Sequence, residues 1–531
     1  MRDIFIGREE EINILRKRVD SFLQGYRQNI AILGKTNIGK SYLIEYFLKT
    51  YKPRNLQSIY INLEYINYSS FNINILYLIL TGYLKKETNA VNLQEKLKIV
   101  ESLLPEINKY LPETAKKIND FLAKKERINF DILTAIINAF IKDTGVYLLW
   151  ILNDYTKLAD FSKKMLSQLS KYIMGQKNIM YIFISSNERR AEKMLSEELN
   201  LLFGNFEKIY LKGFSAVEAQ KFIKIKLGRI DSVAERFLIN ISGLNPFYLD
   251  LLTSCFKQNQ PGANIDYLSF LRTLNLCLSD KASPVYNVLQ AKLMRLKEKF
   301  KDVYEVNKYL ISIAEGKKCK NEIGNSLEIE SKNVARILNK LIEEETIKRN
   351  GDVYFFADNL FAFWVSIVLK ARMFCPYCSE DEIKDITFNY LEEKFVIFKE
   401  ESAKSNIDKI LKLVRLFGDE NIKINNKKVL LPTIKRLRVV DSYHKTMKFI
   451  IGEGKKYLII SFKDTAPREE DIQEFINRCR YFKGRKLRKI FLSLESVDEN
   501  CRLLAKINKV SLWERDEINF LMKIYNQPPI I

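Results

Sequence analysis

Residues 29–41 read NIAILGKTNIGKS, and this stretch decides the fold of the first part of the chain. Asn29 to Gly34 is a continuous apolar run of strand length, which is typical of a buried strand. Gly34 to Ser41 has the spacing G-x-x-x-x-G-K-S, and residues 42–50 have a helical pattern. A strand, a glycine-rich loop and a helix in this order predict a loop that binds phosphate groups.

Each part of this loop has a physical role in the predicted site. The glycines let successive backbone N–H groups turn toward the phosphates, and the helix N-terminus adds partial positive charge. We expect Lys40 to contact the β- and γ-phosphates of ATP and the Ser41 hydroxyl to be a ligand of Mg²⁺. The predicted loop consists of Gly34, Lys35, Thr36, Asn37, Ile38, Gly39, Lys40 and Ser41.

Four further apolar runs of strand length follow, separated by helical patterns. Continuous apolar strands between helices indicate a parallel sheet that is covered on both faces. We therefore expect an α/β protein with the parallel sheet of a P-loop NTPase, and a helical insertion at 93–140. The four runs are 58–63, 146–152, 180–185 and 208–211.

ATP hydrolysis also needs carboxylates at the end of a neighbouring strand. The run 146–152 ends in Asn153 and Asp154, where an acidic pair is usual. Asp154 is expected either to hold Mg²⁺ through water or to orient the attacking water. The sequence leaves both alternatives open. With one carboxylate at this strand end, the sequence predicts slow hydrolysis. Asn187, after the fourth strand, is expected either to sense the γ-phosphate or to cap the strand end.

The remaining chain is expected to form three further regions. Helical patterns at 215–300 predict a helical lid, after the ATPase core at 1–214. Residues 301–372 contain three helical patterns and then a hairpin around Asn350-Gly351, which is the pattern of a winged helix. Residues 373–531 mix helices with strands and are expected to form a separate α/β domain.

Several short boxes together resemble the archaeal-type P-loop ATPases of the STAND class, relatives of the origin-recognition ATPases in the AAA+-like group. The resemblance spans about residues 4 to 370. It implies that Arg8 lies near the adenine, that Pro246 lies near the base or sugar, and that a restriction-nuclease-like domain follows the winged helix. Beside the loop, the boxes are FIGREEE (5–11), LNDYTKL (152–158), IYLKGFS (209–215), GLNPFYL (243–249) and DNLFAFW (358–364).

The chain departs from this family at residues that carry chemistry. The acidic pair is Asn153-Asp154, and Asn205 stands where the family often has an arginine. In the last domain, Asp441 and Lys463 match a nuclease site, but Ser461 stands at the position of its glutamate. Because a hydroxyl cannot replace an anionic ligand of Mg²⁺, we expect a degenerate domain that does not cleave DNA.

The net charge of +22 and the pI near 9.4 favour a polyanionic partner such as DNA, although a lysine-rich surface also serves solubility alone. On the predicted recognition helix, 331–341, Lys332, Arg336 and Lys340 share one face. Glu343 to Glu345 follow at once and would repel phosphate. A second basic cluster runs from Arg478 to Lys489, in which we expect Arg485, Lys486, Arg488 and Lys489 to contact DNA.

The seven cysteines are too few for a disulfide scaffold and predict a reducing, cytoplasmic location. No apolar run reaches the roughly 20 residues of a membrane span. Cys375 to Cys378 read CPYC, like a glutaredoxin site, but they follow a helix, so redox catalysis is not expected. His444, the single histidine, is expected at the surface and not in a metal site.

These observations favour a nucleotide-controlled, DNA-associated ATP-binding switch. Two alternatives stay open at this stage. One is a protein-interaction switch whose winged helix never meets DNA, and the other is an active ATP-dependent nuclease of a defence system.

Overall fold

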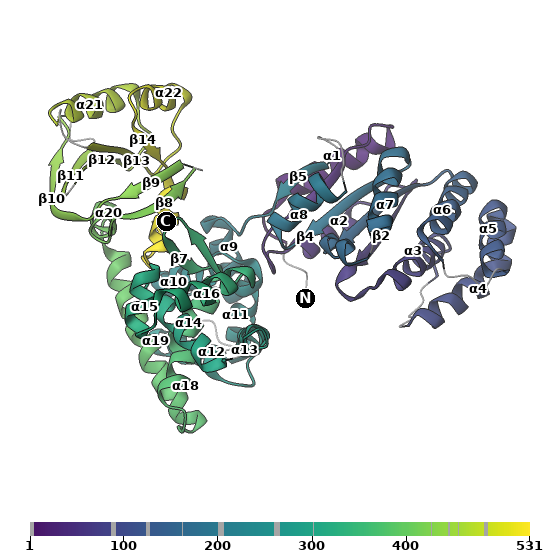
Figure 1. Ribbon diagram of the computed structural model, residues 1–531, viewed down its shortest axis with the longest axis horizontal. Coiled ribbons are helices and arrows are strands. Elements are labelled where there is room, and N and C mark those ends of the chain that lie inside the picture. The colour runs from purple at the N-terminus through teal and green to yellow at the C-terminus, as the bar shows by residue number, and fades with distance from the viewer. Residues whose placement is uncertain are drawn as a thin grey trace. The chain divides into compact units, whose positions relative to one another are not determined.

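The computed structural model describes residues 5–86, 92–123, 128–161, 163–199, 206–259, 266–300, 302–425, 427–443, 447–454, 456–482 and 487–530. The chain divides into two compact units (Figure 1). Unit 1 holds residues 1–214 with 245–247, and unit 2 holds 215–244 with 248–531. Each unit is described by itself.

Unit 1 is built on a five-stranded parallel sheet with the order β2-β3-β4-β1-β5. The middle strands β3, β4 and β1 are buried, which explains their continuous apolar sequences. This sheet and its covering helices form the P-loop NTPase fold, as the sequence predicts. The strands are β1 (Asn29–Leu33), β2 (Leu56–Asn62), β3 (Tyr147–Asn153), β4 (Ile179–Ser185) and β5 (Phe206–Tyr210).

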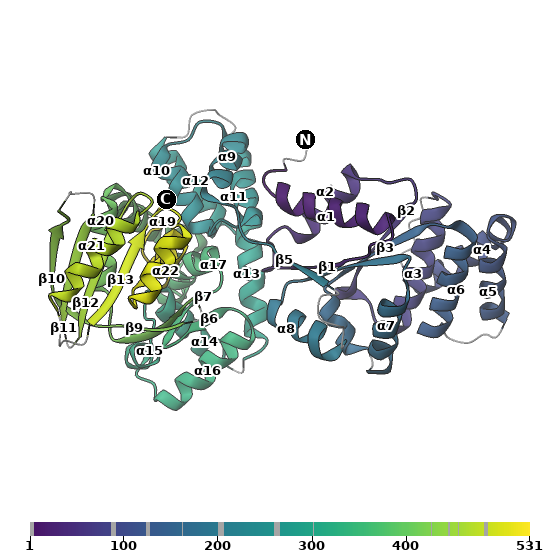
Figure 2. The same cartoon turned by 90° about the horizontal axis from the view of Figure 1, so that it is seen from above.

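Helices cover both faces of this sheet (Figure 2). Helices α1 (Glu9–Leu23) and α2 (Lys40–Thr50) pack on one face. On the other face, the connection between β2 and β3 forms a helical layer that shares one core with α7 (Lys163–Gly175). That connection comprises the short η1 (Leu63–Tyr65), α3 (Tyr68–Tyr83), α4 (Leu93–Tyr110), α5 (Pro112–Ala123) and α6 (Phe130–Thr144).

Three short elements complete unit 1 at the strand ends. Residues Tyr155–Asp160 form η2 directly after β3, and α8 (Glu188–Lys193) with η3 (Met194–Glu198) follows β4. The helical insertion expected at 93–140 is therefore present, as α4, α5 and most of α6.

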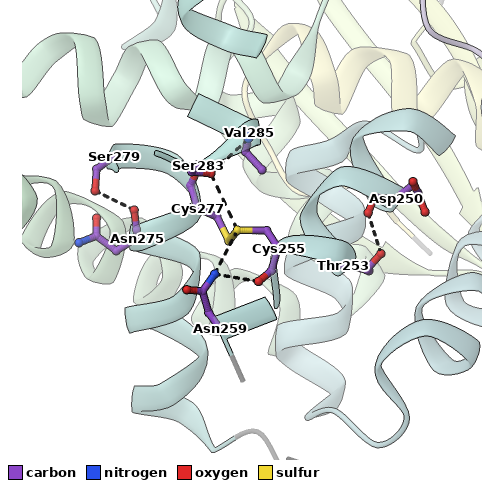
Figure 3. Close-up of a disulfide and its surroundings, with 9 residues drawn as sticks. All are labelled: Asp250, Thr253, Cys255, Asn259, Asn275, Cys277, Ser279, Ser283 and Val285. Carbon is purple, nitrogen blue, oxygen red and sulfur yellow. Dashed lines mark hydrogen bonds between the residues drawn. A yellow bond between two sulfur atoms is a disulfide. The ribbon is translucent and has the colours of Figure 1, made fainter. Parts of the chain in front are cut away.

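Unit 2 begins with five helices, of which α9 starts with a capping box formed by Ser215 and Glu218. A disulfide joins Cys255 of α11 to Cys277 of α12, and both cysteines are buried (Figure 3). The Asn259 Nδ2 atom lies 3.5 Å from the Cys255 sulfur. The helices are α9 (Ala216–Leu227), α10 (Ser232–Ser242), α11 (Pro246–Asn259), α12 (Tyr267–Ser279) and α13 (Pro284–Lys297).

Three helices and a hairpin come next, which is the winged-helix arrangement expected from the sequence. The hairpin, or wing, consists of β6 (Ile347–Asn350) and β7 (Val353–Phe356), joined at Gly351 with φ +64°. The three helices are α14 (Val303–Ala314), α15 (Lys320–Leu327) and α16 (Ser331–Glu343), and α17 (Asn359–Trp364), η4 (Val365–Leu369) and α18 (Lys370–Phe374) follow the wing.

The end of the chain contains a second five-stranded sheet, with the order β10-β11-β12-β13-β14. Its first three strands are antiparallel and its last three are parallel, so the sheet is mixed. The strands are β10 (Ile434–Asp441), β11 (Lys448–Gly454), β12 (Tyr457–Lys463), β13 (Leu487–Ser493) and β14 (Ser511–Trp513).

Two apolar layers enclose this mixed sheet. Helices α21 (Glu469–Arg480) and α22 (Glu499–Ile507) cover one face. The other face packs against α20 (Asn406–Arg415), α23 (Arg515–Ile524) and a hairpin of β8 (Glu420–Ile424) and β9 (Lys427–Leu431). The long helix α19 (Glu380–Ala403) precedes them and packs on α12.

Candidate nucleotide site

The predicted phosphate loop lies between β1 and α2, at the carboxyl end of the parallel sheet. Gly39 (φ +94°) and Asn37 (φ +62°) both have left-handed backbone conformations, which glycine and asparagine adopt most easily. A Cβ atom on Gly34 would meet the Leu211 carbonyl oxygen at 2.7 Å, so only glycine fits where the loop passes β5. Lys35, Thr36 and Asn37 are exposed, and Ile38 is buried.

Lys40 is the first residue of α2, and its side chain folds back over the loop. Its Nζ donates hydrogen bonds to the carbonyl oxygens of Gly34 at 2.8 Å and Lys35 at 2.7 Å. Burial lowers the pKa of this ammonium to about 8, and Asp154 and Glu188 oppose the lowering. The structure therefore positions one partly desolvated cation inside the loop.

Ser41 and Tyr60 connect the loop to the neighbouring strands. The half-buried Ser41 side chain forms a hydrogen bond with Tyr60, which belongs to β2. Burial raises the pKa of the Tyr60 phenol, so its hydroxyl is protonated at neutral pH. The hydroxyl predicted to hold Mg²⁺ thus has a defined neighbour.

Asp154 follows β3 directly and begins η2 in a left-handed conformation, with φ +53°. Burial raises the pKa of the Asp154 carboxyl, Glu64 raises it further, and Lys40 and Lys157 lower it. Asp154 also accepts a hydrogen bond from the backbone of Ser186. The structure thus places Asp154 near enough to Lys40 for each charge to shift the pKa of the other.

Asn153 is the last residue of β3 and is 9% exposed. It lies in register between Asn62 of β2 and Ile184 of β4. The role of Asn153 beside the phosphates stays a prediction. Whether Asp154 holds Mg²⁺ or orients the attacking water also stays open.

Two carboxylates that the motif analysis missed lie near these groups. Glu64, in η1 after β2, acts on Asp154, and Glu188, in α8 after β4, acts on Lys40. Both are exposed. The signal that could have found them is the strand order, because β2 and β4 flank β3 and parallel strands end at one edge of a sheet. The end of β3 carries one carboxylate, as the sequence indicates, but the ends of β2 and β4 add Glu64 and Glu188 at the same edge of the sheet.

Asn187 caps a helix in the structure. Its side-chain oxygen accepts a hydrogen bond of 2.8 Å from the Arg190 N–H and so begins α8. The sequence predicts a cap of the strand end, and the structure shows a cap of the helix that follows. Sensing of a γ-phosphate by Asn187 stays a prediction.

Arg8 lies against the loop, although it precedes it by more than twenty residues. Its guanidinium pairs with Glu11 at 3.3 Å and donates to the carbonyl oxygens of Ile38 and Lys212. Through these contacts, the FIGREEE box joins the loop to the segment after β5. Contact of Arg8 with an adenine stays a prediction.

Pro246 is the first residue of α11, and its expected position beside the base or sugar also stays a prediction. Within unit 2, Tyr248 of one family box contacts Asp358 of another. The Tyr248 hydroxyl donates to Asp358, which also accepts from Lys292 at 2.7 Å. Burial would raise the pKa of the Asp358 carboxyl, but Lys292 and Tyr248 outweigh it and hold the pKa below its usual value. The boxes GLNPFYL and DNLFAFW therefore join the helices of this unit.

The predicted DNA-contacting residues separate into three groups. On α16, Lys332 and Arg336 are exposed. Lys340 instead donates to the Lys299 carbonyl and lies 4.5 Å from the Phe300 ring centre, so the three cations do not form one free face. Arg485 and Lys486 lie outside the described residues.

Arg488 and Lys489 belong to β13. Both are half-buried between strands, and burial lowers the pKa of Arg488. Lys489 Nζ lies 3.5 Å from the Asn508 carbonyl oxygen. Their contact with DNA stays a prediction, and Asn205 and His444 lie outside the described residues.

The residues proposed for a degenerate nuclease site do not converge. Asp441 pairs with Lys448 at 2.8 Å, directly opposite it across β10 and β11. Lys463 instead forms a buried ion pair with Asp471 of α21, and Ser461 is fully buried and donates to the Met447 sulfur. Register and strand alternation put Asp441 on the opposite face of the sheet from Ser461 and Lys463. The mixed sheet therefore provides no such site from these three residues.

Among the described residues, no group of three or more His, Cys, Asp or Glu side chains could hold a metal ion. No helix in the described ranges is long and apolar enough to cross a membrane. A Mg²⁺ site built on phosphates, one hydroxyl and one carboxylate needs no such cluster. In the turn 375–378, a disulfide joins the two cysteines of CPYC, and Tyr377 is fully exposed.

No known protein family matches the sequence, and no curated protein matches it. Among solved structures, the chain is similar to the Walker-type ATPase of Pyrococcus abyssi, with 16% identity, a TM-score of 0.48, and coverage of 69% of this chain and 97% of that chain. It is also similar to Aeropyrum pernix ORC2 in its ADPNP–ADP complexes, with 13% identity, a TM-score of 0.40, and coverage of 75% and 98%. The A. pernix ORC1 protein in complex with DNA has 12% identity, a TM-score of 0.35, and coverage of 68% and 93%. These values are too low to support an argument about function, so the fold class rests on the sheet itself.

Proposed function

We propose that the protein binds ATP with Mg²⁺ and acts as a nucleotide-controlled switch that associates with DNA. The observation that carries this proposal is the convergence of Lys40, Ser41 and Asp154 at the carboxyl end of one parallel sheet. Donors on the loop and a buried cation fit a polyphosphate, and a carboxylate fits the metal that accompanies it.

The residues of the chain divide the work in this proposal. The loop N–H groups and Lys40 bind the phosphates, while Ser41 and Asp154 would hold Mg²⁺, which supplies charge neutralisation at the phosphates. Glu64 lies close enough to Asp154 to raise the pKa of its carboxyl. Glu64 is therefore the candidate that orients the attacking water. Hydrolysis is proposed to be slow, because Asn153 replaces an acidic residue and Glu64 is exposed.

The DNA part of the proposal is supported by the net charge of +22 and by the exposed Lys332 and Arg336 on the third helix of the winged helix. A winged helix of this type reads base edges with that helix. Nuclease activity is not proposed, because Asp441 and Lys463 lie on opposite faces of the second sheet.

The test is a nucleotide titration followed by a DNA titration on the same protein. The parent is expected to bind a fluorescent ATP analogue, and ATP is expected to change its affinity for duplex DNA. Lys40→Ala is expected to lower ATP affinity by about 100-fold or more, because it removes a charged partner of the phosphates. Unchanged ATP binding by this variant would disprove the site, and DNA affinity that ignores ATP would disprove the switch.

A further inference from the structure

The wing of the winged helix is not free in this protein, because it packs on the hairpin of β8 and β9 (Figure 1). Val353 of the wing belongs to the same apolar core as Ile422 and Val429 of the hairpin. Asn350 Nδ2 donates to the Lys423 carbonyl at 2.9 Å. These contacts join two regions that are far apart in the sequence.

The hydrogen bonds at the tip of the wing are specific as well. The Asp352 N–H donates to the Asn421 carbonyl at 2.8 Å, and the Asp352 carboxylate accepts from Asn421 N and Nδ2, each at 2.9 Å. A Cβ atom on Gly351 would meet the Asn421 carbonyl oxygen at 1.8 Å. The close approach of the two hairpins therefore depends on this glycine.

A hollow of about 870 Å³ lies between the two hairpins and is lined mainly by polar and basic residues. Arg349 comes from the wing, and Lys423 and Lys428 come from the hairpin. All three are exposed, and neither lysine forms an ion pair within the described part of the chain. Asp352 also lines the hollow, and its hydrogen bonds with Asn421, together with Lys428 and Arg349, hold its pKa below the usual value.

The positions of the two lysines in the β8–β9 hairpin are unfavourable. Lys423 and Lys428 are directly opposite each other in the antiparallel hairpin. Like charges at such positions repel and destabilise the pair. Asp352 attracts Lys428 electrostatically, but the hollow holds three cations against this one carboxylate, and such a local charge imbalance is typical of a functional site. An anion bound in the hollow would remove the repulsion.

The lining also indicates which polyanion fits. Proteins that bind single strands stack bases on aromatic rings, and no aromatic residue lines this hollow. Exposed cations fit the phosphate backbone, and contacts to this backbone position a protein on a duplex but carry no sequence information.

We infer that the wing and the β8–β9 hairpin together form a binding site for the phosphate backbone of duplex DNA, through Arg349, Lys423 and Lys428. The inference rests on the proposed function, because that proposal makes DNA the partner. It adds a surface that α16 does not contain, and it assigns sequence-independent affinity to this surface.

The test compares two triple variants in salt-dependent titrations of a labelled DNA duplex of arbitrary sequence. The site variant is R349Q/K423Q/K428Q. The control, K435Q/R436Q/R438Q, removes the same charge from exposed residues of β10. Because each phosphate contact contributes roughly 0.9 to the log–log salt slope, the site variant is expected to flatten the slope by up to about 2.7 and the control by much less.

A second variant distinguishes a loss of DNA binding from a loss of folding. K423Q/K428Q is expected to weaken DNA binding while thermal stability stays constant or rises, because it removes the repulsion between the lysines. Equal effects of the site and control triples, or no effect of the site triple on a parent that binds, would overturn this inference alone. Tighter binding to single strands than to the duplex would also overturn it. A parent that binds no duplex at low salt would overturn the DNA part of the proposed function as well, while ATP binding would still stand.

Discussion

The two five-stranded sheets of this protein use their charged residues in opposite ways. In the parallel sheet of unit 1, Lys40, Asp154, Glu64 and Glu188 come from four separate segments and meet at one edge. In the mixed sheet of unit 2, Asp441 and Lys463 pair with separate partners on opposite faces. In the parallel sheet, strand ends from separate segments lie at one edge, whereas in the mixed sheet strand register and alternation put Asp441 on the opposite face from Lys463.

The largest expected effect concerns the buried ion pair of the mixed sheet. Asp471→Ala is expected to lower the free energy of unfolding by about 4 kcal/mol, because it leaves Lys463 buried without its partner. Urea unfolding followed by tryptophan fluorescence measures this change. A loss below about 1 kcal/mol would show that Lys463 is free to reach solvent, as a residue of an open site would be.

A pH titration tests the cation of the parallel sheet. The pKa of Lys40 is about 8, so the ammonium is charged below that pH and loses its proton above it. ATP affinity is therefore expected to be constant from about pH 6 to 7 and to fall by up to about tenfold per pH unit above 8. Calorimetric titration of ATP gives the profile. Lys40→Met is the control and is expected to lack this decline, and a parent profile that stays flat to pH 9.5 would contradict the assignment.

Glu64→Gln separates the roles of the two carboxylates in the parallel sheet. The change is expected to lower ATP turnover about 100-fold, the lower end of the contribution of a positioned base, with little change in ATP affinity. Because the Glu64 carboxylate raises the pKa of Asp154, its removal should also move the acid limb of the rate profile to lower pH. Phosphate release across a pH series measures both effects. Glu188→Gln is the matched control, and a pH profile that does not move would show that Glu64 acts only on structure.

The smallest expected effect is that of Asp441→Ala. Its ion pair with Lys448 is about half exposed at both side chains, so its loss is expected to cost less than about 0.5 kcal/mol. No cleavage of plasmid DNA with Mg²⁺ or Mn²⁺ is expected before or after the change. Metal-dependent cleavage that disappears in this variant would mean that the mixed sheet forms a site after all.

The sequence predicted the strands of the parallel sheet well, because buried parallel strands are continuous apolar runs. Two other strands lack such a run: β10, IKRLRVVD, is an exposed edge strand with three cations, and three of the five residues of β8, ENIKI, are polar. The loop itself was predictable residue by residue. Glu64 and Glu188 were not, because their positions follow from the order β2-β3-β4, which no local pattern contains. The hollow between the two hairpins was not predictable for the same reason, because it is formed by segments some seventy residues apart in the sequence.

The burial of the disulfide between α11 and α12 affects how fast it can be reduced. Exchange requires an attacking thiolate to reach sulfur, yet Cys255 is 3% exposed and Cys277 is not exposed at all. A reductant can therefore act only after the two helices separate, so the oxidation state of this pair is fixed when the chain folds and changes slowly afterwards. Cys375 and Cys378 are half-buried in a turn with exposed neighbours and follow the surroundings quickly. A reductant is therefore expected to open the Cys375–Cys378 disulfide faster than the Cys255–Cys277 disulfide.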